Sequence, residues 1–138
     1  MGKSIRDVMT QNPRTVDSDS PVVEAARLMK EEDVGSIPVM EGPHLMGMLT
    51  DRDITIRIVA ERRDPQTTTA GEIASHDLAT IDPDQSLDDA LRIMAQYQVR
   101  RVPVVAEDGK LIGIVAQADA AREASEKKVG ETLEAIST

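Results

Sequence analysis

The sequence contains no cysteine, phenylalanine or tryptophan, and it has a single tyrosine. Without cysteine, the chain forms no disulfide, has no thiol nucleophile and offers a metal no sulfur ligand. Because aromatic rings are nearly missing, the core must be aliphatic, and a ligand cage of stacked aromatic residues is excluded. These absences fit a reducing compartment, and we expect a cytoplasmic location.

Long apolar runs and an excess of basic residues are also missing. No apolar run approaches the roughly 18 residues that a membrane-spanning helix needs, and the N-terminal residues lead into no apolar signal segment. The formal net charge of -9 repels polyanions, and the basic clusters Arg62-Arg63 and Arg100-Arg101 are short. We therefore expect neither a membrane nor a nucleic-acid partner.

The chain of 138 residues, the size of one ordinary domain, contains an internal duplication. The segment Thr15 to Asp19 recurs 65 residues later as Thr80 to Asp84. The same spacing relates Ala25, Arg27, Met29, Val34 and Pro38-Val39 to Ala90, Arg92, Met94, Val99 and Pro103-Val104. After a one-residue insertion, Leu45, Gly47 and Asp53 correspond to Leu111, Gly113 and Asp119. We predict two repeats, residues 1–65 and 66–138, joined by a polar linker over residues 61–71, the second carrying a charged tail.

Each repeat has the pattern βαββα. The expected strands are residues 14–16, 37–40 and 45–49, and then 79–81, 102–105 and 111–115. Ser20-Pro21 and the Ser86-x-x-Asp89 capping box mark the starts of two amphipathic helices. A last helix should run from Thr50 to about Arg62, and its counterpart from near Ala116 into the tail. The fold class is therefore α/β (α+β), with a three-stranded sheet in each repeat and proline marking an edge strand or a bulge.

The segment Gly47 to Asp53 (the first box) carries the clearest candidate chemistry, because it lies where a strand ends and a helix begins. Free backbone N–H groups favour an anion there, Thr50 could donate to a phosphate, and Asp53 could accept the paired hydroxyls of a ribose. The same Thr-x-x-Asp spacing is also a capping box that needs no ligand. Both interpretations remain open. The second box, Gly113 to Asp119, keeps the aspartate but has Ala116 in place of the hydroxyl residue.

Three features, each present twice, make the sequence resemble the cystathionine-beta-synthase (CBS) repeat family, whose paired repeats form a Bateman module. They are the Thr-Val or Thr-Ile strand, the segments Val34 to Val39 and Val99 to Val104, and the Gly-x-x-Thr-x-x-Asp box, which in the second repeat has Ala116 in place of the threonine. Nearly the whole chain is covered, as in stand-alone bacterial CBS proteins of hypoxic or stress responses. The resemblance implies two repeats packed as a pseudo-symmetric pair, with ligand clefts between them.

The resemblance implies AMP, ADP or ATP as the ligand, with no required cofactor and no metal. The first cleft would use Thr15, Val16, Ile37, Pro38, Thr50, Arg52 and Asp53. The second would use Thr80, Ile81, Arg100, Arg101, Val102, Pro103 and Asp119, with the arginine pair offsetting the hydroxyl lost at Ala116. Arg52, Arg100 and Arg101 also suit plain solvated surface positions. We expect the first cleft to bind more strongly, and the second to be weaker or empty.

The expected function is a non-catalytic regulatory module that binds an adenine nucleotide and signals through a conformational or assembly change to an unknown effector protein. No nucleophile with a recognisable base supports an enzyme, and His44 and His76 lack the companions of a metal site. The alternative is a ligand-free structural or protein-interaction module. The resemblance implies a homodimer formed through helix faces, for which we expect Ile54, Ile58 and Val59 to be exposed.

Overall fold

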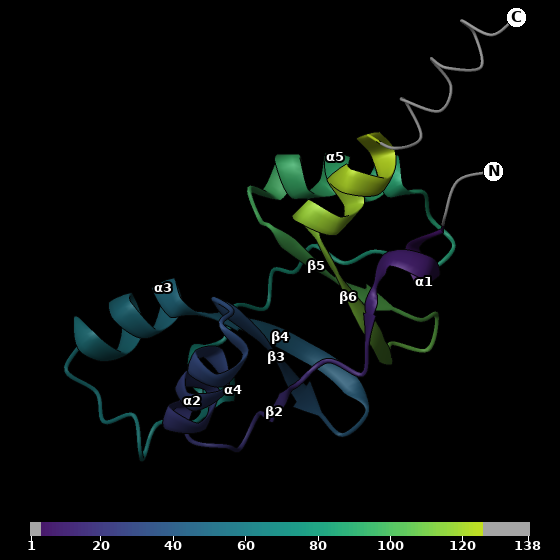
Figure 1. Ribbon diagram of the computed structural model, residues 1–138. Coiled ribbons are helices and arrows are strands. Elements are labelled where there is room, and N and C mark those ends of the chain that lie inside the picture. The colour runs from purple at the N-terminus through teal and green to yellow at the C-terminus, as the bar shows by residue number, and fades with distance from the viewer. Residues whose placement is uncertain (1–3, 126–138) are drawn as a thin grey trace, which may run out of the picture. The chain divides into compact units, whose positions relative to one another are not determined.

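The computed structural model describes residues 4–125, and these divide into two compact units. The first-repeat unit is Arg14–Leu78, and the second-repeat unit combines Met1–Pro13 with Ala79–Thr138. Each unit has a small three-stranded sheet with helices (Figure 1), so the expected α/β class and the presence of two three-stranded sheets are confirmed. The third strand of the second sheet is Thr10–Gln11, however, and the expected strand at residues 79–81 is reduced to a single bridge between Ile81 and Val104. Among the described residues, no helix has the length and apolar character to cross a membrane.

The first-repeat unit contains a sheet in the order β2-β3-β4. Its elements are β2 (Val16–Asp17), α2 (Val22–Glu32), β3 (Ser36–Glu41), β4 (His44–Thr50), α3 (Asp51–Ile54), the π-helix η1 (Thr55–Val59) and α4 (Ala70–Ile73). Strand β2 runs parallel to β3, and β3 and β4, which contain the strands expected at 37–40 and 45–49, form an antiparallel hairpin. The expected last helix is thus present, but its second half is a π-helix.

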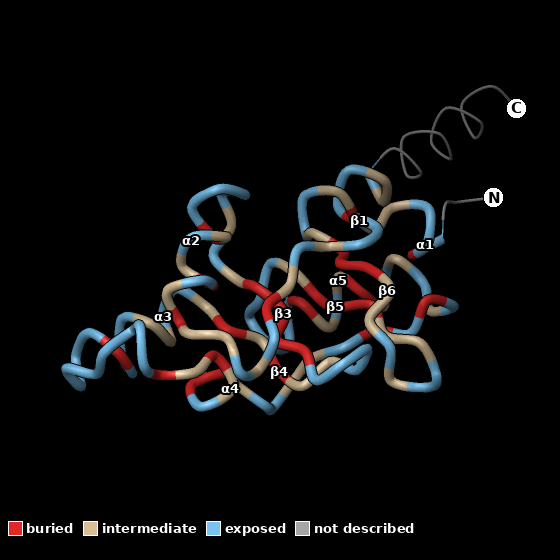
Figure 2. The backbone as a smooth tube through the Cα atoms, turned by 90° about the horizontal axis from the view of Figure 1, so that it is seen from below, coloured by how far each residue is buried: buried red, intermediate tan, exposed pale blue. Residues whose placement is uncertain are grey.

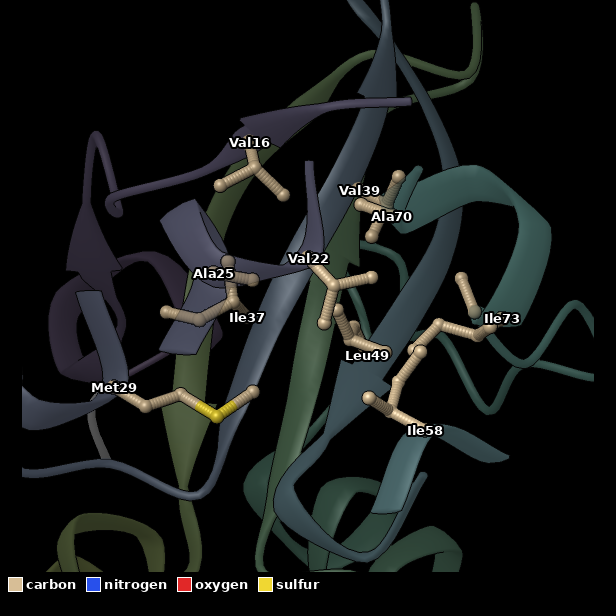
Figure 3. Packing of buried hydrophobic residues seen from close by; sticks show 11 residues of the cluster. Val16, Val22, Ala25, Met29, Ile37, Val39, Leu49, Ile58, Ala70 and Ile73 are labelled. Carbon is tan, nitrogen blue, oxygen red and sulfur yellow. The ribbon is translucent and has the colours of Figure 1, made fainter. Parts of the chain in front are cut away.

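The core of this unit is aliphatic, as the composition predicts. Val22, Ala25 and Met29 of α2 pack against the alternate residues Ile37 and Val39 of β3 (Figure 3), which shows the amphipathic helix on the sheet. The cluster is completed by Val16, Leu49, Ile58, Ala70, Ile73 and Ala74. Ile58 is only 3% exposed, so the expectation that it belongs to an exposed apolar surface is wrong. Ile54 is also partly buried against this core.

The second-repeat unit contains a sheet in the order β1-β6-β5. Its elements are α1 (Ile5–Val8), β1 (Thr10–Gln11), α5 (Leu87–Tyr97), β5 (Arg101–Val105) and β6 (Leu111–Ala116), followed by helical residues 117–125. The core joins Ile5, Ile81, Ala90, Met94, Val102, Val104, Val115 and Ala120. Figure 2 shows buried residues along both hairpins. The predicted continuation of the last helix through the tail lies outside the described residues.

The segment that precedes each repeat in sequence packs against the other repeat. Strand β1 pairs antiparallel with β6, with Thr10 opposite Ile114. Correspondingly, Ser75 forms an antiparallel bridge with Met48 of β4. The boundaries of the compact units, after Pro13 and after Leu78, therefore differ from the boundary at residues 65 and 66 that we predicted for the repeats. The predicted linker 61–71 was too long, because α4 begins at Ala70 and Ala70 is buried.

Pro38 lies in β3, the middle strand of the β2-β3-β4 sheet, and a register shift follows between Val39 and Met40, so of the expected edge strand or bulge it has the bulge. Pro103 lies in β5, at the end of the β1-β6-β5 order. The contacts of Pro103 show why a proline is tolerated. The Ile81 N–H donates to the Pro103 carbonyl at 3.0 Å. Because the N and carbonyl of one strand residue face the same side, the Pro103 nitrogen also faces Ile81. The β5–β6 ladder therefore loses no hydrogen bond.

The helix starts follow the sequence signals closely. Ser86 caps α5, accepting from the Asp89 N–H at 3.0 Å, while the Ser86 N–H donates to Asp89 Oδ2 at 3.2 Å. The Ser86 N–H and hydroxyl, together with Arg92, hold the pKa of the Asp89 carboxyl below its usual range. In α2 the helix begins one residue later than expected, because Pro21 takes the cap position rather than the first helical position.

Candidate functional site

The first box forms a reciprocal capping box at the end of β4. The Asp53 N–H donates to Thr50 Oγ1 at 3.0 Å, and the Thr50 N–H donates to Asp53 Oδ2 at 2.9 Å. Both residues are half-buried. Because Thr50 Oγ1 accepts this bond, its hydroxyl hydrogen stays available to an acceptor such as a phosphate oxygen. Thr50 and Asp53 therefore cap the helix, and the Thr50 hydroxyl can still donate to a ligand.

The second oxygen of Asp53 faces the segment that follows α4. Ser75 Oγ lies 3.4 Å from Asp53 Oδ1 and donates to it. Each carboxylate oxygen thus receives one donor, from residues 22 and 3 positions away in the chain. A carboxylate oxygen has two acceptor sites, so Oδ1 can still accept a ligand hydroxyl. The carboxylate is oriented and retains acceptor capacity.

The other predicted residues of the first-repeat unit lie on the sheet or at the start of α3. Val16 pairs with Val39, the neighbour of Pro38, which places Thr15 and Val16 beside β3. Thr15 is half-buried, while Val16, Ile37 and Pro38 are buried. Arg52 is exposed, and among the described residues its guanidinium has no hydrogen-bond or ion-pair partner. In the first-repeat unit, two groups of predicted site residues are therefore in contact: Thr50 is hydrogen-bonded to Asp53, and Val16 pairs with the β3 segment.

The second box is organised differently. Ala116 replaces the capping hydroxyl, and Asp119 Oδ1 accepts from Arg122 Nη2 at 2.9 Å, three residues later in the same helix. The Gln117 N–H donates to the Arg100 carbonyl at 2.7 Å, which ties this box to the residue before β5. A ligand hydroxyl at Asp119 therefore shares the carboxylate with the Arg122 guanidinium, a kind of partner that Asp53 does not have among residues 4–125.

The remaining residues of the second-repeat unit repeat the first arrangement. Ile81 bridges Val104 in parallel orientation, and Val102 and Pro103 are buried in β5, while Thr80 and Arg100 are exposed. Arg101 is half-buried and lies opposite Ala116 across the β5–β6 pair. Within the described part of the chain, neither arginine side chain forms an ion pair.

Two residues that contact the box carboxylates were missed by sequence reasoning. Arg122 is recognisable in retrospect, because an Asp-x-x-Arg spacing on a helix places the two charges on one face. Ser75 is separated from Asp53 by the whole of α4 and the turns before it, and no helical or strand spacing connects them. The available signal was the repeat itself, since Thr10 stands 65 residues before Ser75 and both carry a hydroxyl.

Among residues 4–125, no three histidine, aspartate or glutamate side chains cluster in a way that could hold a metal ion. His44 and His76 are exposed.

The duplicated sheets, hairpins and boxes define a known class of module. The CBS domain family model matches residues 5–60 and 70–126, so the chain belongs to the CBS domain family. A similar solved CBS domain pair, that of protein MJ0100, is in complex with 5-methylthioadenosine and S-adenosyl-L-methionine, which fits a class of ligand-binding regulatory modules.

Individual relatives share nearly the whole chain. CBS domain-containing protein YhcV of Bacillus subtilis is 45% identical over 135 residues, 97% of this chain and 95% of the relative. Hypoxic response protein 1 of Mycobacterium tuberculosis is 40% identical over 132 residues, 95% of this chain and 92% of the relative. A crystal structure of Hypoxic Response Protein I with two coordinated zinc ions matches with a TM-score of 0.80 and 41% identity, covering 87% of this chain and 98% of that one.

A solved structure with a bound nucleotide is also similar. The crystal structure of CBSX2, a protein of Arabidopsis thaliana, in complex with AMP matches with a TM-score of 0.78 and 27% identity. The match covers 92% of this chain and 99% of that one.

Proposed function

We propose that the protein is a non-catalytic regulatory module that binds an adenine nucleotide at the first box. The observation that carries the proposal is the geometry of Thr50 and Asp53, which keeps a hydroxyl donor and an oriented carboxylate side by side. A nucleotide presents the complementary groups, phosphate oxygens that accept and ribose hydroxyls that donate. The AMP bound by the similar CBSX2 supports this choice of ligand.

Each residue of the first box has a distinct role in this proposal. Asp53 Oδ1 accepts from the ribose, the Thr50 hydroxyl donates to a phosphate oxygen, and the unpaired Arg52 supplies a positive charge to the phosphates. The backbone of Thr15, Val16, Ile37 and Pro38 would flank the adenine, since the side chains of Val16 and Ile37 lie in the core. Binding has a regulatory effect if the nucleotide prefers one conformation or assembly of the module, which an effector protein then detects.

The second box is the weaker site in this proposal. It lacks a hydroxyl donor at Ala116, and a ligand shares the Asp119 carboxylate with Arg122. Thr80, Ile81, Val102 and Pro103 supply the matching strand positions, and Arg100 and Arg101 can contact phosphate in place of the missing hydroxyl. We propose that this site is empty or binds with lower affinity.

Isothermal titration calorimetry of nucleotide-stripped protein with AMP, ADP, ATP and S-adenosylmethionine tests the proposal. We expect an adenine nucleotide to bind with one dominant, tighter site, because only the first box retains its hydroxyl donor. The Asp119→Ala variant should keep this tight site. The absence of binding heat with all four ligands would contradict the proposal. It would favour the alternative of a ligand-free interaction module, in which Thr50 and Asp53 serve only to cap the helix.

We further propose that the module forms a homodimer through η1. Ile58 is buried, but Ile56 and Val59 are 43% and 68% exposed and supply an apolar surface. Light scattering should show a dimer, and Val59→Asp should shift the protein toward the monomer, because the new carboxylate is desolvated at the interface. A monomeric parent protein contradicts the dimer, whereas a dimer insensitive to Val59→Asp contradicts this choice of surface.

A further inference from the structure

Asp53 receives its two side-chain hydrogen bonds from different parts of the first-repeat unit. The Thr50 N–H on Oδ2 comes from the box itself, at 2.9 Å. The Ser75 hydroxyl on Oδ1, at 3.4 Å, comes from the segment after α4. A single bond from Thr50 leaves the carboxylate free to rotate about its last torsion, because such terminal torsions have broad energy minima. A second donor on the other oxygen restricts that rotation.

The position of Ser75 is determined by the strand that carries the first box. The Ser75 N–H donates to the Met48 carbonyl at 2.8 Å, and the Met48 N–H donates to the Ser75 carbonyl at 3.1 Å. Gly47 makes this approach possible, because a Cβ there would lie 2.7 Å from the Ser75 carbonyl oxygen. Arg57 Nη1 also donates to the Ile73 carbonyl at 2.8 Å. The segment is therefore held at the carboxylate by backbone and side-chain bonds.

The second-repeat unit provides an internal comparison. Thr10 occupies the place of Ser75, since it pairs with Ile114 as Ser75 pairs with Met48. Yet the bond on Asp119 Oδ1 comes from Arg122, and no bond joins Thr10 to Asp119 among the described residues. A hydroxyl at this sheet position is thus common to both units, whereas its bond to the box carboxylate is found in the first-repeat unit.

We propose that Ser75 is a positioning residue for nucleotide binding, which holds Asp53 with Oδ1 directed to accept the ribose hydroxyls. This inference rests on the proposed nucleotide site at the first box. Ser75 acts through Asp53 and need not touch the ligand. Without the Ser75 hydroxyl, the Asp53 carboxylate can rotate, and a ligand must restrict that rotation when it binds. The affinity for a ligand that carries ribose hydroxyls therefore falls.

The test compares Ser75→Ala, Ser75→Thr and the matched control Thr10→Ala by calorimetry. The probes are the tightest-binding of AMP, ADP and ATP and its 2′,3′-dideoxy counterpart, which lacks both ribose hydroxyls. We expect Ser75→Ala to weaken binding of the natural nucleotide by about threefold to tenfold, the range of one hydrogen bond. Ser75→Thr should restore affinity to within about twofold, since it keeps the hydroxyl. Thr10→Ala should leave it unchanged.

The dideoxy nucleotide separates positioning from a general structural role. Its affinity should be equal in the parent protein and in Ser75→Ala, because it makes no bond to Asp53. Equal losses for both ligands, or no loss for either, would overturn the inference. If the parent protein binds none of the three nucleotides, the proposed function itself fails. If the parent binds and Asp53→Ala does not, while Ser75→Ala binds like the parent, the inference alone fails.

Discussion

Replacing Asp53 with alanine should weaken adenine nucleotide binding by at least about a hundredfold. The variant loses two hydrogen bonds between ribose hydroxyls and a charged carboxylate, each of which contributes about 1.5–3 kcal/mol. Combining it with Thr50→Ala should abolish detectable binding, because the phosphate donor is then lost as well. Calorimetry with the ligand that binds the parent protein measures the change.

The capping role of Asp53 requires a control for stability. Its side chain also accepts the Thr50 N–H, so Asp53→Ala should lower the free energy of unfolding by about 1 kcal/mol. Glu72 has the same place in the capping box of α4, where it accepts the Thr69 N–H at 3.1 Å. Glu72→Ala should therefore cost similar stability with unchanged affinity. If Asp53→Ala and Glu72→Ala lose affinity equally, the loss is caused by reduced stability. If Asp53→Ala keeps full affinity, the Asp53 carboxylate is not part of the binding site.

Patterns within one repeat predicted the fold because they depend on local chemistry. The four hairpin strands and helices α2 and α5 follow from apolar spacing, and the Ser86 box marked the start of α5 correctly. The duplication also identified equivalent positions, such as Thr50 and Ala116. The difference between the two boxes was also visible in the sequence, because Ala116 has no hydroxyl where the first box has Thr50.

The contacts between distant segments could not be derived in this way. Helix α4 has four residues and α1 also has four, too few to show an amphipathic period. Their packing depends on sheet edges formed by the other repeat, and so does the bond from Ser75 to Asp53. The π-helix at Thr55–Val59 changes the side-chain spacing, and Ile58 is buried where an exposed surface was expected. Tertiary packing decided each of these features.

The exchange of segments predicts that Ile5 is a core residue of the second-repeat unit, although it lies close to the N-terminus. Its side chain is fully buried in the cluster with Ile81 and Val104. Ile5→Ala should lower the free energy of unfolding by about 2–4 kcal/mol, because it removes buried methyl groups and leaves a cavity. Urea unfolding followed by far-ultraviolet circular dichroism measures the loss, since a single tyrosine gives little fluorescence signal.

The location of the damage distinguishes this explanation from a general loss of stability. Hydrogen exchange in Ile5→Ala should accelerate in β5 and β6 more than in β3 and β4, because Ile5 packs in the core that contains Val102 and Val115. Val99→Ala is the control: a truncation at a position 37% exposed, outside the proposed dimer surface, should change stability by less than about 0.5 kcal/mol. If Ile5→Ala costs no more than this control, the N-terminal segment does not complete the second core. A large loss with faster exchange in β5 and β6 instead means that folding of the second repeat requires residues that precede the first.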